Sequence, residues 1–155
     1  MLIEHILHRK GSQVATISAD APVSDAIVLL REHNIGALVV TSPGPPATAD
    51  QHPALGGILS ERDIVRALAD AAPETAAALS RPVSTLMSTE VTTCGPRATV
   101  DELMRVMTDR RIRHIPVMDG ARLAGIVSIG DVVKSRIDEL QTETDTLHEY
   151  LASGR

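Results

Sequence analysis

The sequence predicts an α/β protein of the α+β type, made of two pseudo-symmetric repeats. We expect each repeat to form a small three-stranded sheet with two helices on one face. Three observations carry this prediction: a helical apolar pattern that occurs twice, two short apolar strands after each such helix, and a repeated Gly-apolar-apolar-Ser-x-x-Asp signature. The chain has 155 residues, 43% of them hydrophobic, which is enough to bury a core in one or two small domains.

A short apolar segment and a first strand open each repeat, although the spacing between them differs in the two copies. The matching apolar residues of this segment are Ile3, Ile6 and Leu7 in the first copy and Val83, Leu86 and Met87 in the second. A first helix follows, with apolar residues at i, i+3, i+4 and i+7. These residues are Val23, Ala26, Ile27 and Leu30, and then Val100, Leu103, Met104 and Met107.

Two apolar strands follow each helix and predict a hairpin. In the first repeat they cover residues 35–40 and 55–60, and in the second they cover residues 112–117 and 123–128. Each hairpin leads into a second helix that starts at the Ser-x-x-Asp part of the signature. The predicted unit is therefore a leading segment, a strand, a helix, two hairpin strands and a helix.

These patterns divide the chain into four parts. Residues 1–70 form the first repeat, which includes a Pro-rich loop at residues 41–54. Residues 71–82 form a linker, and residues 83–140 form the second repeat. Residues 141–155 continue the last helix as a C-terminal helical tail.

Composition argues against several classes of protein. The net charge of −5 and an aromatic content of 1% disfavour nucleic-acid binding, which uses basic surfaces and stacking platforms. We interpret the basic cluster of Arg105, Arg110, Arg111 and Arg113 as a solvated helix end. No apolar run reaches the length of a membrane span, and the single Cys94 suits a reducing compartment, so we expect a cytoplasmic protein. No cluster of metal ligands and no catalytic motif occurs.

The repeated signature places a serine at the end of a strand and an aspartate in the first turn of a helix. In the two copies these are Ser60 with Asp63, and Ser128 with Asp131. A carboxylate in that position can accept two hydroxyl hydrogen bonds, which is what a ribose 2′,3′-diol offers. The alternative is that both aspartates only cap their helices. The duplication of the pair favours the binding interpretation.

The two units resemble tandem CBS domains, named after cystathionine β-synthase, and together they resemble a Bateman module. The resemblance covers roughly residues 3 to 140 and rests on Gly57–Asp63, Gly125–Asp131 and the strand Arg111–Val117. Nothing catalytic is appended, so the chain resembles the stand-alone bacterial CBS-pair proteins, such as the hypoxic response proteins. The resemblance implies a nucleotide site in the cleft between the repeats, formed by residues of both.

The resemblance implies two ligand sites, each named here after its aspartate. The Asp131 site would contain Gln13, Ala15, Ile35, Gly36, Arg113, His114, Ile126, Ser128 and Asp131. The Asp63 site would contain Gly36, Ala37, Ile58, Ser60, Arg62, Asp63, Thr92, Ile112 and Arg113. Because Arg113 and His114 would meet the phosphates of the first site, we expect the Asp131 site to prefer the more highly phosphorylated ligand.

The functional prediction is a nonenzymatic regulatory module that binds adenosine-containing ligands, such as AMP, ADP, ATP, NAD or S-adenosylmethionine, and signals energy or redox state. No catalytic cofactor and no metal is expected. A homodimer is expected, because the family pairs such modules and twofold dimers are common. The alternative is a ligand-independent dimerisation or adaptor module that regulates a partner protein.

Overall fold

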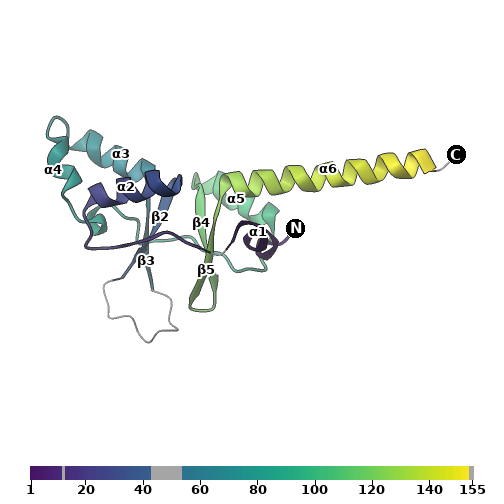
Figure 1. Ribbon diagram of the computed structural model, residues 1–155, viewed down its shortest axis with the longest axis horizontal. Coiled ribbons are helices and arrows are strands. Elements are labelled where there is room, and N and C mark those ends of the chain that lie inside the picture. Colours follow the sequence, from purple (N-terminus) through teal and green to yellow (C-terminus); the bar gives the residue numbers. More distant parts are fainter. Residues whose placement is uncertain (12, 43–53, 154–155) are drawn as a thin grey trace.

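The computed structural model describes residues 1–11, 13–42 and 54–153, which form two lobes side by side (Figure 1). The first lobe contains β1 (Thr16–Ser18), α2 (Val23–His33), β2 (Ala37–Thr41), β3 (Leu55–Ser60) and α3 (Glu61–Asp70). The second lobe contains α5 (Val100–Arg110), β4 (His114–Asp119), β5 (Arg122–Ser128) and α6 (Ile129–Ser153). The remaining elements are α1 (Ile3–Lys10), α4 (Thr75–Leu79) and the 3-10 turn η1 (Val83–Thr85). This architecture confirms the mixed α/β class with two repeats.

The two sheets differ in their number of strands. In the first lobe β2 is central, with β1 parallel on one side and β3 antiparallel on the other. In the second lobe the described residues form only the antiparallel pair of β4 and β5. The expected third strand is reduced to a single parallel bridge between Cys94 and Val117. The prediction of three strands is therefore correct for the first repeat and wrong for the second.

A proline explains the missing strand. In the first lobe the N–H of Val39 donates to the carbonyl oxygen of Ala15 at 3.2 Å. The equivalent residue of the second lobe is Pro116, which has no N–H, so this hydrogen bond cannot form. The chain around Cys94 keeps only two bonds to β4, from its own N–H to Pro116 and from the N–H of Met118.

The leading segments are exchanged between the lobes. Helix α1 buries Ile3 and Ile6 in the core of the second lobe, and η1 buries Val83 in the core of the first. Matching backbone bonds join Val83 to Ala21 at 2.8 Å and Ile3 to Ala98 at 2.9 Å. The boundaries at residues 1–70 and 83–140 follow the sequence repeats, whereas the packing crosses them.

The glycine of each signature gives the exchanged segment room to approach the sheet. A Cβ on Gly57 would lie 2.8 Å from both the Met87 sulfur and the Ser88 carbonyl oxygen. A Cβ on Gly125 would lie 2.6 Å from the Leu7 side chain. A larger residue in place of Gly57 would have to displace the backbone at Ser88, and one in place of Gly125 would have to move the Leu7 side chain aside, so both glycines suit the close packing of the exchanged segments.

The connections follow the sequence in part. Within the linker, α4 forms a short helix that ends before Pro82. Residues 43–53 of the Pro-rich loop, and residues 154–155 of the tail, lie outside the described residues. The last helix is continuous from Ile129 to Ser153, and its second half projects beyond the second lobe (Figure 1).

Candidate functional site

Two cavities lie between the lobes, and residues of both repeats line each of them. The first has a volume of about 990 Å³ and contains Asp131, and the second has a volume of about 440 Å³ and contains Asp63. Gly36, Ala37 and His114 line both cavities and therefore form the boundary between them. Both volumes lie in the range of small-molecule sites, roughly 300–1,000 Å³.

Each aspartate is held by the same hydrogen bonds at the N-terminus of a helix. Oδ2 of Asp63 accepts from the N–H and the hydroxyl of Ser60, at 2.8 and 2.7 Å. Oδ2 of Asp131 accepts from the N–H and the hydroxyl of Ser128, both at 2.8 Å. The serine oxygens in turn accept from the aspartate N–H groups, which completes a capping box at α3 and the same arrangement at α6.

Both aspartates thus do cap their helices, as the alternative interpretation expected. Capping, however, uses only one of the two oxygens of each carboxylate. Within the described residues, no hydrogen bond reaches Oδ1 of Asp63 or of Asp131. Each carboxylate therefore keeps one oxygen for a further donor inside its cavity. Helix capping and hydroxyl binding are compatible at both positions.

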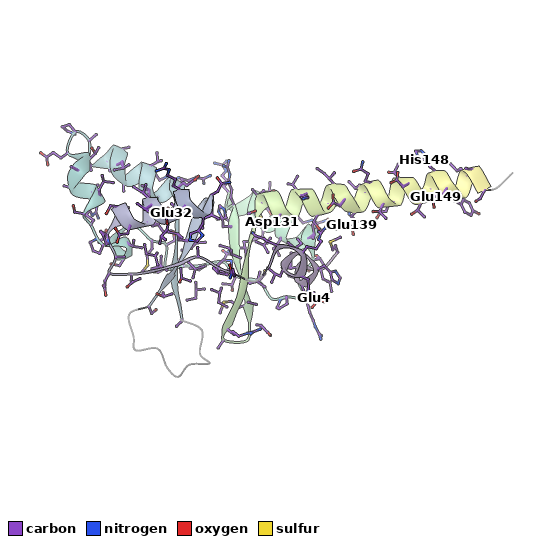
Figure 2. All side chains as sticks on the ribbon, in the orientation of Figure 1. Glu4, Glu32, Asp131, Glu139, His148 and Glu149 are labelled. Atoms are coloured by element: carbon purple, nitrogen blue, oxygen red, sulfur yellow. The ribbon has the colours of Figure 1, made fainter. Side chains whose placement is uncertain are left out.

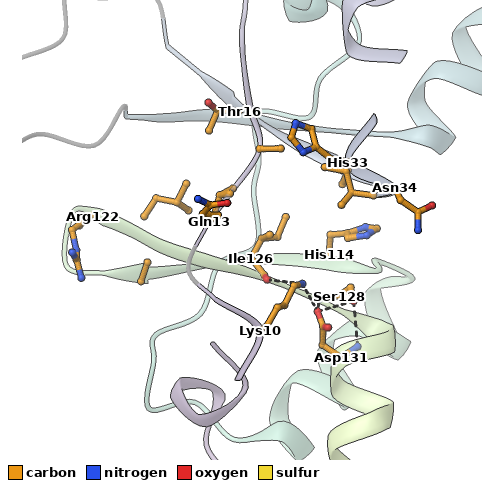
Figure 3. Close-up of a pocket in the computed structure, with 17 residues that line it drawn as sticks. Lys10, Gln13, Thr16, His33, Asn34, His114, Arg122, Ile126, Ser128 and Asp131 are labelled. Atoms are coloured by element: carbon orange, nitrogen blue, oxygen red, sulfur yellow. Dashed lines mark hydrogen bonds and ion pairs between the residues drawn. The ribbon is translucent and has the colours of Figure 1, made fainter. Parts of the chain in front are cut away.

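Lys10 distinguishes the first cavity from the second. Its ammonium lies 2.6 Å from Oδ2 of Asp131 and 3.3 Å from the carbonyl oxygen of Ile126 (Figure 3). Burial alone would raise the pKa of Asp131, but the hydrogen bonds from Lys10 and Ser128 outweigh it and lower that pKa. Asp131 is consequently ionised throughout the neutral range. Figure 2 shows it at the start of α6, on the side of the second lobe that faces the first.

His114 lies at the boundary of the cavities, close to the glycine of the other lobe. A Cβ on Gly36 would lie 3.1 Å from Cε1 of His114, so the small residue leaves the space that the imidazole needs. Burial, and then the nearby charge of Lys10, lower the pKa of His114, against the opposite influence of Glu61 and Asp131. At neutral pH the imidazole is therefore uncharged.

The second cavity carries more positive charge than the first. Five arginines line it, against the two carboxylates of Glu61 and Asp63. They are Arg62, Arg66, Arg110, Arg111 and Arg113. The first cavity has Lys10 and Arg122, the neutral His114, and the carboxylate of Asp131. Anion attraction is thus concentrated at the Asp63 cavity.

The structure brings together most residues named for the Asp131 site. Eight of them line the first cavity: Gln13, Ala15, Ile35, Gly36, His114, Ile126, Ser128 and Asp131. Arg113, which precedes β4, does not line it; Arg113 lines the second cavity, whereas its neighbour His114 lines both. The expectation that this cavity prefers the more highly phosphorylated ligand depended on Arg113, and that basis is therefore wrong.

Most residues named for the Asp63 site also lie together, around the second cavity. The second cavity is lined by Gly36, Ala37, Ile58, Ser60, Arg62, Asp63, Ile112 and Arg113. Thr92 lines neither described cavity, and its hydroxyl accepts a hydrogen bond from Arg110 at 3.0 Å. Thr92 thus contacts the site only through Arg110, a residue that lines the second cavity.

The sequence interpretation missed the cations that matter most in the two cavities. Lys10 was missed because it belongs to the exchanged leading segment. The alignment of the two repeats places that segment in the first repeat and gives no sign that it lies next to Asp131. Arg110 and Arg111 are exposed, as expected for a helix end, yet they line the second cavity. Arg111 caps the end of α5 in the left-handed region, at φ 53°, and turns the chain into β4. Their place at the end of this helix is the feature of the sequence that could have indicated them.

Other candidate groups are not arranged for chemistry. Burial raises the pKa of Cys94 to about 11, so its thiol stays protonated at neutral pH and is a poor nucleophile. In the described part of the chain, no group of three or more potential side-chain ligands is placed to hold a metal ion. None of the helices in the described ranges combines the length and the apolar character that a membrane crossing requires.

Comparison with known proteins agrees with this arrangement. The profile of the CBS domain family matches residues 4–70 and 83–138. The chain therefore belongs to the CBS-domain family and carries the domain twice. CBS-domain proteins are generally regulatory.

Several curated proteins are similar over most of the chain. The CBS domain-containing protein CBSX3, mitochondrial, of Arabidopsis thaliana is 37% identical over 139 residues, which are 88% of this chain and 63% of the relative. The protein YhcV of Bacillus subtilis is 32% identical over 81% of each chain. Hypoxic response protein 1 of Mycobacterium tuberculosis is 31% identical over 78% of this chain and 77% of its own. The resemblance to stand-alone CBS pairs is thus confirmed.

Solved structures share the fold. A CBS-domain containing protein from Agrobacterium tumefaciens is 43% identical, with a TM-score of 0.77 over 87% of this chain and 92% of that one. The CBS domain pair of protein MJ0100, solved in complex with 5′-methylthioadenosine and S-adenosyl-L-methionine, is 25% identical. Its TM-score is 0.72, over 90% of this chain and 98% of that one.

Proposed function

We propose that this CBS pair is a nonenzymatic regulatory module that binds adenosine-containing ligands in its two interlobe cavities. The observation that carries the proposal is the duplicated carboxylate: Asp63 and Asp131 each line a cavity at a helix N-terminus, and within the described residues no hydrogen bond reaches their Oδ1 atoms. The candidate ligands are AMP, ADP, ATP, NAD and S-adenosylmethionine. The relative solved with S-adenosylmethionine and 5′-methylthioadenosine, both adenosine compounds, supports this class.

The two ends of each cavity suit different parts of such a ligand. A ribose diol donates to the carboxylate oxygen, and the backbone N–H groups of the helix N-terminus favour an anion nearby. Val14, Ala15, Ile35 and Ile126 offer aliphatic walls for the base in the first cavity. The chain has neither Trp nor Phe, so adenine is held between aliphatic side chains.

The distribution of charge predicts a preference between the cavities. The five arginines of the second cavity favour the ligand with more phosphate groups, because Arg pairs with phosphate oxygens through two donors at once. The first cavity suits a ligand with one anionic group. Occupancy of the two cavities then responds to different nucleotides, which is what a sensor of energy or redox state requires.

Binding is tested by melting temperature and by calorimetric titration with the five candidate ligands. A ligand at about 100 times its dissociation constant stabilises the fold by about 2.7 kcal/mol, a readily visible shift. Asp63→Ala and Asp131→Ala each remove one class of site. Because both aspartates also cap helices, the matched control is Glu102→Ala, which breaks the capping box of α5 away from the cavities. Unchanged stoichiometry in both aspartate variants would refute the assignment.

A second candidate function is a dimerisation or adaptor module. Helix α6 supports it, because it exposes a row of apolar side chains at successive spacings of four, three, seven and four residues, on a side of the helix away from the buried Val132 and Ser135. The row consists of Val133, Ile137, Leu140, Leu147 and Leu151. We propose that a second copy of the chain covers this row. Leu140→Glu with Leu147→Glu should convert the dimer to a monomer in sedimentation equilibrium, whereas a melting temperature that no candidate ligand changes would favour the adaptor over the sensor.

A further inference from the structure

One cavity contains a cation that competes directly with the expected ribose. Lys10 donates to Oδ2 of Asp131, the carboxylate assigned above to the ribose hydroxyls. Counting from the matched pair Ile3 and Val83, the residue equivalent to Lys10 in the second repeat is Glu90. In the described part of the chain, no ion pair reaches Asp63. The competition is therefore a property of the Asp131 cavity alone.

The position of Lys10 is set by the fold. Lys10 is the last residue of α1, and Ile3 and Ile6 anchor that helix in the core of the second lobe. The N–H of Gly11 bonds to the carbonyl oxygen of Leu7 at 2.8 Å and ends the helix at the cavity. The backbone of Lys10 is thus fixed, while its side chain, which is 39% exposed, can swing within the cavity.

We propose that Lys10 makes the Asp131 cavity select adenosine ligands that carry an anionic group and reject uncharged adenosine. This inference rests on the proposed function of the same cavity. When one hydroxyl of the ribose diol donates to Oδ1 of Asp131 and the other donates to Oδ2, the second hydroxyl displaces the ammonium of Lys10 from Oδ2. With adenosine, Lys10 then stays partly buried in the cavity near His114 without its carboxylate partner, which is costly.

A phosphorylated ligand removes that cost. Its anionic oxygens accept the ammonium that the ribose displaces, in a charge-assisted hydrogen bond. Lys10 therefore exchanges one negative partner for another, and only an anionic ligand permits the exchange. Lys10 therefore contributes to selectivity in two ways: it opposes the binding of uncharged adenosine and it attracts the phosphorylated ligand.

The experiment compares AMP and adenosine in calorimetric titrations of full-length protein with the Asp63→Ala substitution, so that only the first cavity is measured. Lys10→Met removes the charge and keeps the length of the side chain. Adenosine should then bind about fivefold more tightly and AMP about fivefold more weakly, the change expected for one partly exposed ion pair gained or lost. Lys10→Arg should keep the preference for AMP.

Lys134→Met is the matched control, because Lys134 is the only other lysine of the chain and is exposed on α6 outside both cavities. An unchanged ratio of AMP to adenosine affinity in Lys10→Met would overturn the role of Lys10, as would an equal change in Lys134→Met. If Lys10→Met fails to fold, Lys10→Gln must show the same loss of preference. If the Asp63→Ala protein binds neither compound, the proposed function of the cavity fails, and the inference fails with it.

Discussion

The two repeats share one scaffold and differ at the residues that decide binding. Both have a serine–aspartate pair at a helix start, a glycine against an exchanged segment, and a register shift in the hairpin after Val40 or Val117. They differ in the third strand and in the cations of their cavities. The comparison teaches that backbone geometry and packing keep the twofold symmetry, whereas single side chains give the two cavities different preferences.

The largest expected effect concerns the central strand of the first lobe. Val39→Pro removes the N–H that bonds to the carbonyl oxygen of the half-buried Ala15 and places a proline ring in the buried strand β2, so we expect a loss of roughly 3 kcal/mol in the free energy of unfolding. Urea unfolding measures it. The reciprocal Pro116→Val should cost less than about 1.5 kcal/mol, because the second lobe never had that bond. Equal losses in the two variants would contradict our explanation of the missing strand.

The next effect tests the glycines of the signature. Gly57→Ala should destabilise by about 2 kcal/mol, since the new Cβ meets the backbone oxygen of Ser88, which cannot move alone. Gly125→Ala should cost about half as much, because the Cβ meets the end of the Leu7 side chain, which can rotate. Thermal unfolding of both variants gives the order, and the reverse order would show that the exchanged segments are held by other contacts.

A smaller and symmetric effect is expected for the helix caps. Ser60→Ala and Ser128→Ala each remove a hydroxyl that bonds to the N–H of the following aspartate, at a cost of about 1 kcal/mol. Urea midpoints should fall by similar amounts in the two variants. Replacement by threonine serves as the control, because it keeps the hydroxyl. A decrease of the urea midpoint in only one of the two alanine variants would show that the two caps do not contribute equally to stability.

The smallest effect is a dependence of stability on pH that belongs to one residue. The pKa of His114 is lowered in the folded protein, so the unfolded chain binds more protons and stability decreases as the pH falls below about 6.5. The lowered pKa of Asp131 acts separately, below about pH 4. His114→Gln should flatten the profile between pH 6.5 and 5 in urea unfolding, whereas His148→Gln on the exposed tail should not.

Much of the fold was predictable because it depends on local patterns. The apolar spacing of α2 and α5 and the paired apolar strands of the hairpins are properties of short segments, and both matched the structure. The absence of a third strand in the second lobe was not predicted, although Pro116 is visible in the sequence. Its effect depends on which neighbour would have accepted the missing hydrogen bond, and that neighbour is known only when the strands are paired.

The candidate sites were predictable to the same extent. The aspartates and serines are read from one motif, and the structure places both pairs in cavities. Lys10 and Arg110 were missed, because each belongs to an element whose position depends on how the lobes pack. Arg66 was missed although it lies three residues after Asp63 on the same helix, α3. Arg113 was expected at both sites and lines only the second cavity, while the neighbouring His114 lines both.

The amino-acid sequence by itself determined the duplicated unit, its helices and hairpins, and the capping serine–aspartate pairs, because these follow from side-chain periodicity and from hydrogen bonds a few residues apart. Only the tertiary structure decided the exchange of the leading segments, the partner of Lys10 and the unequal charge of the two cavities. These depend on contacts between residues far apart in the sequence, 121 positions in the case of Lys10 and Asp131, and no local pattern encodes which distant surfaces meet.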